Sequence, residues 1–274
     1  MSQCMNIAER KDPLEKDYQP VEVCDKISSH LFWVIAGLTI FSIYQKKIIP
    51  PAYHELSINL STAFYIVLVL FNNIVFIVNR FHYTPRAESK RRQELLSNAF
   101  DIRLITSRTN LYYNNPLSPS IAKLGLNVFE NTLFGKTICG KMAEVERIRV
   151  ASYFALWIFS AVWRRTDLQF LSFLFQIVFS TQVALRYLSI EFCRAKFESL
   201  FNQLHTLFLD SNSGKRDDHY FIVNILMFFA EYESTKAAAM FKQSSKMFRK
   251  YNAELSAEWE TIKKDHNLAV EVGL

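Results

Sequence analysis

The residues best suited to bind a ligand are basic and aromatic and follow one another between positions 90 and 113. They are Lys90, Arg91, Arg92, Arg103, Arg108, Tyr112 and Tyr113. Arginine forks bind phosphate oxygens in pairs, and a tyrosine ring can stack on a base. The stretch therefore predicts a nucleotide or oligonucleotide site. The same cations also suit the flank of a membrane span, where they need no ligand.

No pattern typical of an enzyme is present in the sequence. Residues 134–137 read FGKT and end like a phosphate-binding loop, but Glu130 stands where that motif needs a glycine five residues before Gly135. The six histidines show no metal-binding spacing, and the four cysteines form no CxxC pair. We therefore expect a protein that is not an enzyme and that uses no metal or cofactor.

Composition favours helices that cross a membrane. Half of the residues are apolar, and 24 Phe stand against only 6 Gly and 7 Pro. An all-β protein needs many turns, and Gly and Pro are common turn residues, so this composition favours a mostly helical protein. The formal net charge of +6 is moderate and indicates basic residues beside membrane spans as readily as an anionic ligand.

Four apolar runs are candidates for spans. Leu60–Val78 carries no charge and is about 19 residues long, enough to cross a bilayer as a helix. Leu168–Tyr187 is about as long, whereas Leu31–Tyr44 and Val150–Trp163 are shorter, at about 14 residues each. Each short run lies a brief connection away from a long one. The pairs therefore predict two helical hairpins.

The distribution of basic residues predicts the orientation of the hairpins. Many lysines and arginines lie between Arg80 and Arg149, whereas each hairpin tip carries only two, Lys46–Lys47 and Arg164–Arg165. Basic residues beside spans stay in the cytoplasm. Both termini and the middle segment of this multi-pass protein are therefore expected there.

The predicted fold is an all-α membrane protein with two transmembrane hairpins, or four spans. A helical cytoplasmic domain is built from the central insert and the C-terminal tail. A last helix is expected from near His219 to about Lys264. The segments are a cytoplasmic N-terminal segment, hairpin 1, a cytoplasmic insert, hairpin 2 and a cytoplasmic helical tail, at residues 1–28, 29–79, 80–148, 149–188 and 189–274.

Amide and hydroxyl side chains lie within the apolar runs and are candidates for a pore lining. They are Asn72, Asn73, Gln169, Gln176, Ser180 and Thr181. Polar groups inside a bilayer must find partners. They predict either hydrogen bonds between helices or a water-lined path between subunits.

Two short motifs carry a family resemblance that covers about residues 30–190. KRRQELLSNAFD contains the pair Phe100-Asp101, and KLGLNVFEN contains Asn127 and Asn131. With the order hairpin, insert, hairpin and tail, the chain resembles the predicted four-transmembrane pore-forming effectors associated with nucleotidyltransferases in bacterial antiphage systems. The resemblance adds Lys123 and Asn127 to the expected ligand site.

The resemblance implies a membrane effector that oligomerises into a gated pore or ion channel. A cyclic nucleotide or oligonucleotide made by a partner nucleotidyltransferase would control it, and the nucleotidyltransferase itself is a further possible partner. Loss of the ion gradients across the inner membrane would cause abortive infection. Two hairpins are too few to enclose a pore, so we expect a homo-oligomer in the lipid bilayer, with a tetramer as the first model.

Two other functions fit the sequence. A membrane-anchored scaffold would recruit a soluble partner through the long C-terminal helices. A small transporter fits less well, because the spans hold no charged relay residues and no visible internal repeat.

Overall fold

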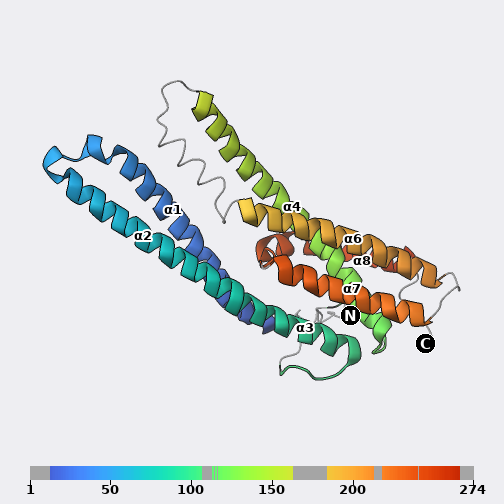
Figure 1. The fold of residues 1–274 in the computed structure, drawn as a ribbon. Helices are drawn as coiled ribbons and strands as arrows, with labels where there is room; N and C mark the ends of the chain where they lie inside the picture. Colours follow the sequence, from blue (N-terminus) through green and yellow to red (C-terminus); the bar gives the residue numbers. More distant parts are fainter. Residues whose placement is uncertain are drawn as a thin grey trace, which may run out of the picture. The chain divides into compact units, whose positions relative to one another are not determined.

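The computed structural model describes residues 13–106, 113, 115, 117–162, 184–212, 218–239 and 241–265. Every regular element within these ranges is helical, and Figure 1 shows their course. In chain order the elements are η1 (Pro13–Tyr18), α1 (Gln19–Ile48), η2 (Pro51–Tyr53), α2 (His54–Val78), η3 (Asn79–Tyr83), α3 (Thr84–Phe100), α4 (Ile121–Val162), α6 (Arg186–Asn212), α7 (Asp218–Ala239) and α8 (Ser245–Asp265).

The chain divides into two units. One, here called the cavity unit, comprises Met1–Tyr18, Pro85–Met142 and Ile190–Leu274. The other, here called the apolar unit, comprises Gln19–Thr84 and Ala143–Ser189. The chain passes from one unit to the other four times: at the start of α1, at the start of α3, within α4 and within α6.

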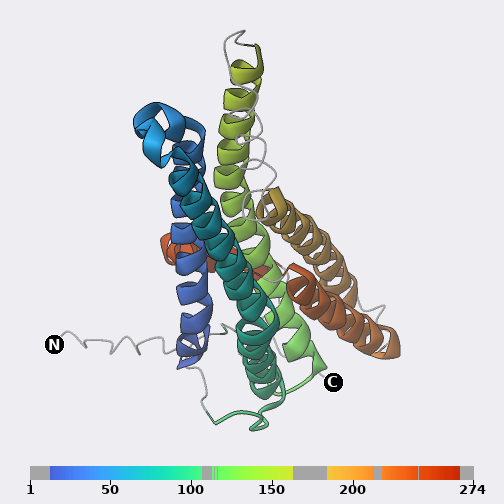
Figure 2. The same cartoon turned by 60° about the vertical axis from the view of Figure 1, so that its left-hand side comes forward.

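In the apolar unit, α1 and α2 pack side by side in antiparallel directions (Figures 1 and 2). Near the end of α1, the side-chain carbonyl of Gln45 accepts hydrogen bonds from the hydroxyls of Ser57 and Ser61, each at 3.2 Å. At the opposite end, Asn79 donates to Asp25 at 2.9 Å. Polar contacts therefore join the two helices at both ends.

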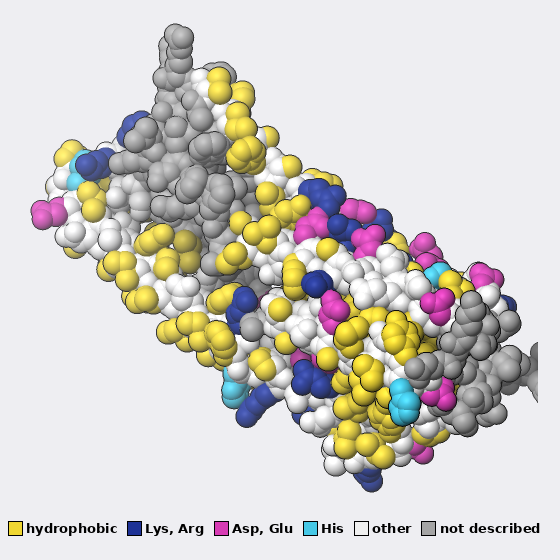
Figure 3. All heavy atoms as spheres, turned by 45° about the vertical axis from the view of Figure 1, so that its right-hand side comes forward, with side chains coloured by type: hydrophobic (Ala, Val, Ile, Leu, Met, Phe, Trp, Pro, Cys, Tyr) yellow, Lys and Arg dark blue, Asp and Glu magenta, His cyan; other side chains and the backbone are white. Residues whose placement is uncertain are grey.

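The apolar side chains of α2 are largely uncovered. Leu60, Leu70 and Ile74 are 69%, 58% and 57% exposed, and Figure 3 shows the apolar band along this helix (yellow) with charges only near its ends. Two helical stretches, Leu14–Ser42 and Pro51–Phe100, are long and apolar enough to cross a membrane, and only 6% of each apolar window is buried. A helix in the core of a soluble protein would instead be mostly buried.

The other two predicted spans are described only in part. The third apolar run, Val150–Trp163, forms the last part of α4, and this helix continues without a break as far as Val162. Most of the fourth run, Leu168–Tyr187, lies outside the described residues. Where the chain resumes, Arg186 Nε lies 3.2 Å from Glu146 Oε1 of α4. Arg149 binds the other oxygen of this buried carboxylate at 2.8 Å. Ionic contacts therefore join α4 to the start of α6.

The core of the cavity unit is centred on Phe129 of α4, which is fully buried. Its ring centroid lies 5.0 Å from that of Phe201, 5.7 Å from that of Phe208 and 5.3 Å from that of Trp259. These partners come from α6 and α8. Such aromatic contacts bury large areas and favour the stacked and edge-on geometries seen here.

Two glycines of α4 allow close packing of its neighbours. A Cβ at Gly135 would lie 2.6 Å from the ring of Phe197 on α6, and one at Gly125 would overlap Ile225 on α7. Any larger residue would push these helices apart. Gly140, on the same helix, has space for a Cβ, since its nearest neighbour, Arg194, would lie at 3.8 Å.

One expected helix is divided in the structure. Instead of a single helix from His219 to Lys264, α7 ends at Ala239 and α8 begins at Ser245, with non-helical residues at 241–244. The hydroxyl of Ser244 accepts a hydrogen bond from the Met247 backbone N–H at 3.3 Å, which caps α8. Apolar periodicity continues through this break and therefore did not indicate it.

Candidate ligand site

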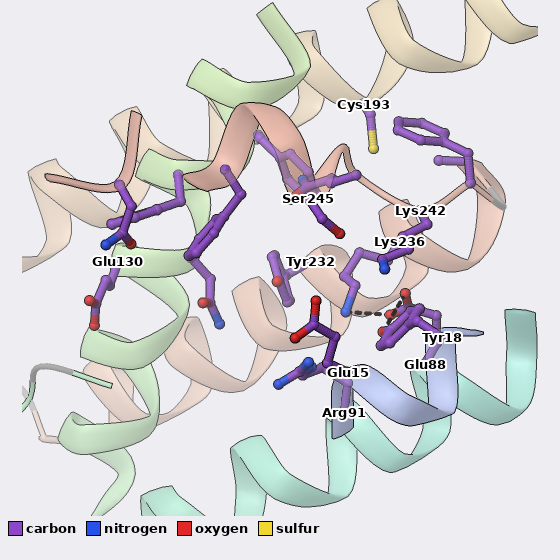
Figure 4. A pocket seen from close by; sticks show the side chains of 18 of the residues that line it. Glu15, Tyr18, Glu88, Arg91, Glu130, Cys193, Tyr232, Lys236, Lys242 and Ser245 are labelled. Atoms are coloured by element: carbon purple, nitrogen blue, oxygen red, sulfur yellow. Dashed lines mark hydrogen bonds and ion pairs between the residues drawn. The ribbon is translucent and has the colours of Figure 1, made fainter. Parts of the chain in front are cut away.

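The cavity unit encloses a cavity of about 650 Å³ within the described residues. Each surrounding helix lines the cavity with one face. η1 and α3 each contribute two side chains three residues apart, and α8 contributes side chains from several of its turns. Tyr18, Glu88 and Arg91 lie in the wall with Lys236 of α7, and Figure 4 shows all four at one side. The cavity falls within the size range of sites for small molecules and cofactors.

A network of charged and polar side chains lies in this wall. The Tyr18 hydroxyl donates to Glu88 Oε1 at 2.8 Å, and Lys236 Nζ lies 2.5 Å from Glu88 Oε2. The ion-paired side chains are only 18% and 14% exposed. The network joins three parts of the chain. Tyr18 is the residue before α1, Glu88 lies on α3, which follows α2, and Lys236 lies on α7.

The pKa values of these groups follow from their burial and from their pairing. Burial acts to raise the pKa of Glu88, but the adjacent Lys236, the Tyr18 hydroxyl and Arg91 together lower it. Burial acts to lower the pKa of Lys236, but Glu88 and its other neighbours raise it. Burial also raises the pKa of Tyr18. The carboxylate and the ammonium are therefore both charged at neutral pH, and Tyr18 keeps its proton.

Two cations converge on the ring of Tyr18. Arg91 lies 5.8 Å from the ring centroid, and Lys242, in the segment between α7 and α8, lies 5.1 Å from it. Both distances fall within the range of cation–π contacts. The positive charges come from separate elements, and the carboxylates of Glu15 and Glu88 lie on the same side of the cavity with them.

The other side of the cavity is formed by α4 and α8 and carries different chemistry. It combines an acid, Glu130, with the amides of Asn131 and Asn252 and the rings of Phe134 and Phe248. The two ring centroids are 5.7 Å apart. Glu130 is 4% exposed, and Figure 4 shows it across the cavity from Lys236 and Lys242.

Two buried thiols, Cys139 and Cys193, lie together, and Cys193 lines the cavity. Hydrogen bonding to Cys139 and burial both raise the pKa of Cys193. Gln243 Nε2 lies 3.6 Å from Cys139 Sγ. Cys193 therefore remains protonated and serves as a packing residue rather than a nucleophile. Within the described ranges, no group of three His, Cys, Asp or Glu side chains is arranged to hold a metal ion.

The structure separates the basic stretch predicted from the sequence. Arg91 lines the cavity, but Lys90 pairs with Asp17 at 2.5 Å and Arg92 pairs with Glu233 at 2.7 Å, and neither lines it. Arg103 contacts the Thr106 carbonyl at 3.4 Å. Of the aromatic pair, Tyr113 lines the cavity. Arg108 and Tyr112 lie outside the described residues.

Asn127 and Lys123 also lie apart from the cavity. Asn127 is fully buried and donates to Asn98 at 2.9 Å, while it accepts from Asn115 at 3.0 Å. The Lys123 carbonyl accepts another hydrogen bond from Asn115 at 3.1 Å. These contacts fix the chain that enters α4, so the role of Asn127 in the structure is to join α3 to α4.

The candidate pore residues are only partly described. Asn73 is exposed and donates to the Val69 carbonyl of its own helix at 3.0 Å, and Asn72 is half-buried. Gln169, Gln176, Ser180 and Thr181 lie outside the described residues.

Sequence reasoning missed Tyr18, Glu88, Lys236 and Lys242. Glu88 and Lys236 are separated by most of the chain, so no local spacing connects them. The one available signal was the i, i+3 spacing of Glu88 and Arg91, which places them on one face of α3.

Comparisons of the chain with known protein families, with curated proteins and with solved structures find no match.

Proposed function

We propose that this protein is a membrane effector of a bacterial antiphage defence system. In this proposal it oligomerises into a pore or ion channel of the inner membrane, with both termini in the cytoplasm. A nucleotide or oligonucleotide signal from a partner nucleotidyltransferase controls the pore. Opening disrupts the ion gradients and causes abortive infection.

The observation that carries the proposal is the position of the cavity residues in the chain. Tyr18 is the last residue before α1, and Glu88 and Arg91 lie on α3, which follows α2 through the π-helical turn η3. A ligand that contacts these three side chains touches the segments that lead into both apolar helices. Irregular helical turns such as η3 often occur at functional sites.

The proposed mechanism starts with a ligand that binds beside Tyr18 and competes with its ring for the nearby cations. An anionic ligand attracts Arg91 and Lys242, which lie 5.8 Å and 5.1 Å from the Tyr18 ring centroid. Any movement of Tyr18 or Glu88 then reaches α1 or α2 along the chain. A ligand shifts such an equilibrium only by its difference in affinity for the two states, which must amount to a few kcal/mol.

The experiment is to measure membrane potential in bacterial cells after induction of the protein, with and without a co-expressed partner nucleotidyltransferase. We expect depolarisation that depends on the nucleotide signal. Replacing both Asn72 and Asn73 by Leu tests the pore lining: conductance should change while the amount of assembled protein stays the same. An intact potential with and without the signal, at equal membrane insertion, contradicts the proposal.

The second candidate function is a membrane-anchored scaffold, and an exposed apolar stripe on α7 favours it. Tyr220, Val223 and Met227 recur at helical spacing and are 64%, 62% and 52% exposed. Exposed apolar stripes are typical of helix-mediated protein interfaces. A scaffold would leave the membrane potential unchanged, and Val223→Lys would abolish capture of its soluble partner.

A further inference from the structure

Helix α7 carries apolar side chains on two opposite faces, and the core covers only one of them. The inner face packs on α6, where the ring centroids of Phe221 and Phe208 lie 5.7 Å apart and the two helices run side by side (Figure 1). A helix that is apolar on both sides is typically covered on both sides. The outer face is instead exposed along the whole helix. We call it the α7 seam, and it consists of Tyr220, Val223, Met227, Ala230, Ser234 and Ala237.

The α7 seam has the spacing of a contact between two helices. Its residues recur at alternating steps of three and four, so that Tyr220, Met227 and Ser234 stand at equivalent positions of successive heptads. This repeat keeps a narrow seam facing one partner helix. Ser234 fits such a contact, because its hydroxyl already donates to the Glu231 carbonyl of its own helix at 3.0 Å.

The charges beside the α7 seam favour a protein helix over a lipid surface. Lys236 is the one Lys or Arg within Asp218–Ala239, and its ammonium pairs with Glu88 in the cavity wall. Glu231, at the edge of the seam, pairs with Lys196 of α6 at 3.1 Å. Helices that lie on a membrane surface instead carry Lys and Arg beside their apolar face, which attract anionic lipid. The α7 seam offers no such attraction and suits an uncharged helix face.

The sizes of the side chains indicate that this helix face belongs to a second copy of α7. The first half of the seam carries its large side chains, and the second half carries its small ones. Two copies that meet in antiparallel directions about a two-fold axis present the same surface to each other. Every layer then combines one large and one small side chain, as close packing requires. The layers are Tyr220 with Ala237 of the partner subunit, Val223 with Ser234 of the partner subunit, and Met227 with Ala230 of the partner subunit.

A parallel pair would pack less well. It would place Tyr220 against its own counterpart and Ala237 against its own counterpart, so large layers would hold the helices apart and small layers would leave voids. The distribution of size along α7 therefore distinguishes the two directions.

We propose that two copies of this chain associate through the α7 seam in antiparallel directions, with the two-fold axis between Met227 and Ala230. One pair of helices buries less than the about 800 Å² per partner of a typical stable interface. Two copies anchored in the same bilayer have a high effective concentration, so a small contact suffices. The inference rests on the proposed function, because it names one contact of the proposed membrane oligomer.

The test is disulfide cross-linking of the full chain in bacterial membranes. The variant carries Val223→Cys together with Ser234→Cys, which face each other across the antiparallel pair. In either single variant the two thiols lie about 16 Å apart along the helix axis. We expect at least about fivefold more cross-linked dimer from the double variant than from either single variant, because a disulfide requires Cα atoms within about 7 Å. The wild-type chain, oxidised in the same way, controls for the native cysteines.

An exchange of side chains tests the packing of the central layer. Added to the double-cysteine variant, Ala230→Met places two large side chains opposite each other and should lower the yield of dimer about tenfold. Adding Met227→Ala as well restores one large and one small side chain and should restore the yield. Both positions are exposed in the single chain, so the amount of inserted protein should not change.

Cross-linking of Val223→Cys alone would show a parallel contact and overturn the inference. A double variant that forms no more dimer than the single variants would overturn it as well, and so would thiols that capture a soluble protein in place of a second copy. None of these results bears on nucleotide-dependent ion flux. Conversely, a cross-linked dimer without any such flux contradicts the proposed function and leaves the α7 contact standing.

Discussion

Lys236 Nζ lies 2.5 Å from Glu88 Oε2, and the other oxygen of that carboxylate accepts the Tyr18 hydroxyl at 2.8 Å. An ion pair with so little exposure is favourable only when further hydrogen bonds compensate the loss of water. Tyr18 supplies one. The pair therefore ties α7 to α3 and to the residue that precedes α1, at the wall of the cavity.

Lys236→Met should destabilise the cavity unit by about 3 kcal/mol at neutral pH, because it leaves the Glu88 carboxylate buried without its cation. The pKa of Glu88 is lowered in the folded protein, so its contribution is present above its ordinary value of 4.5 and is lost as pH falls. Protonation of Glu88 removes the penalty in the variant. The difference in unfolding temperature between wild type and variant should therefore shrink from pH 7 to pH 4.

The matched control for that experiment is Lys196→Met, which removes the cation of a more exposed pair with Glu231 at 3.1 Å. Exposed pairs contribute little, so its effect should stay within about 0.5 kcal/mol. A gap between wild type and Lys236→Met that stays constant or widens on acidification would show that the Glu88 pairing does not stabilise the fold.

Gly135→Ala should destabilise the protein by about 1–3 kcal/mol, because the new Cβ would lie 2.6 Å from the Phe197 ring. Gly140→Ala on the same helix meets only Arg194 at 3.8 Å. It should stabilise the protein by about 0.5–1 kcal/mol through the higher helix propensity of alanine. Thermal unfolding of both variants measures the opposite signs. Equal effects would mean that α4 and α6 do not pack this closely.

Leu70→Lys tests whether the exposed face of α2 lies in lipid. At the centre of a transmembrane helix, lysine costs about 2.5–3.5 kcal/mol of insertion free energy, so less protein should resist alkaline extraction from membranes. On a water-exposed surface the same change would be nearly neutral. Leu209→Lys, at a 43% exposed position of α6, is the control and should insert like the wild type. Equal insertion of both variants would argue against a span at α2.

Arg91→Met and Lys90→Met separate the cavity from the basic stretch around it. Arg91 lines the cavity, whereas Lys90 pairs with Asp17 on its exposed side. Nucleotide affinity should fall about tenfold or more for Arg91→Met, as expected for the loss of a charge-assisted contact. It should change less than about twofold for Lys90→Met. Equal losses in titrations of the two variants would mean that the whole stretch forms the site.

The sequence predicted the helical class from its composition, and it predicted the two helices that are long and apolar enough to cross a membrane. The length of the uncharged run predicted α2, whereas the short run in α1 was predicted only through its longer hairpin partner. Leu60–Val78 needs no partner to be recognised, and it lies within α2. The short helix break between Ala239 and Ser245 was missed, since a serine cap leaves no change in apolar periodicity. Four spans, the oligomer and the orientation remain predictions.

The candidate site was predicted only at Arg91 and Tyr113, because its other members come from distant parts of the chain. Tyr18, Glu88 and Lys236 meet only once α3 and α7 pack together, and no spacing in the sequence records that packing. Asn127 shows the converse case. Its motif placed it in the expected ligand site, but its side-chain amide instead forms hydrogen bonds with Asn98 and Asn115.

Ion flux through proteoliposomes that contain the purified full chain tests the central claim most directly. Mononucleotides and cyclic dinucleotides are added to both sides of the vesicles, and Arg91→Met serves as the ligand-binding variant. We predict that at least one of these nucleotides changes the flux of the wild-type protein about tenfold or more, and that Arg91→Met removes this response. Vesicles that stay equally tight with and without every nucleotide, at confirmed insertion, would contradict the account.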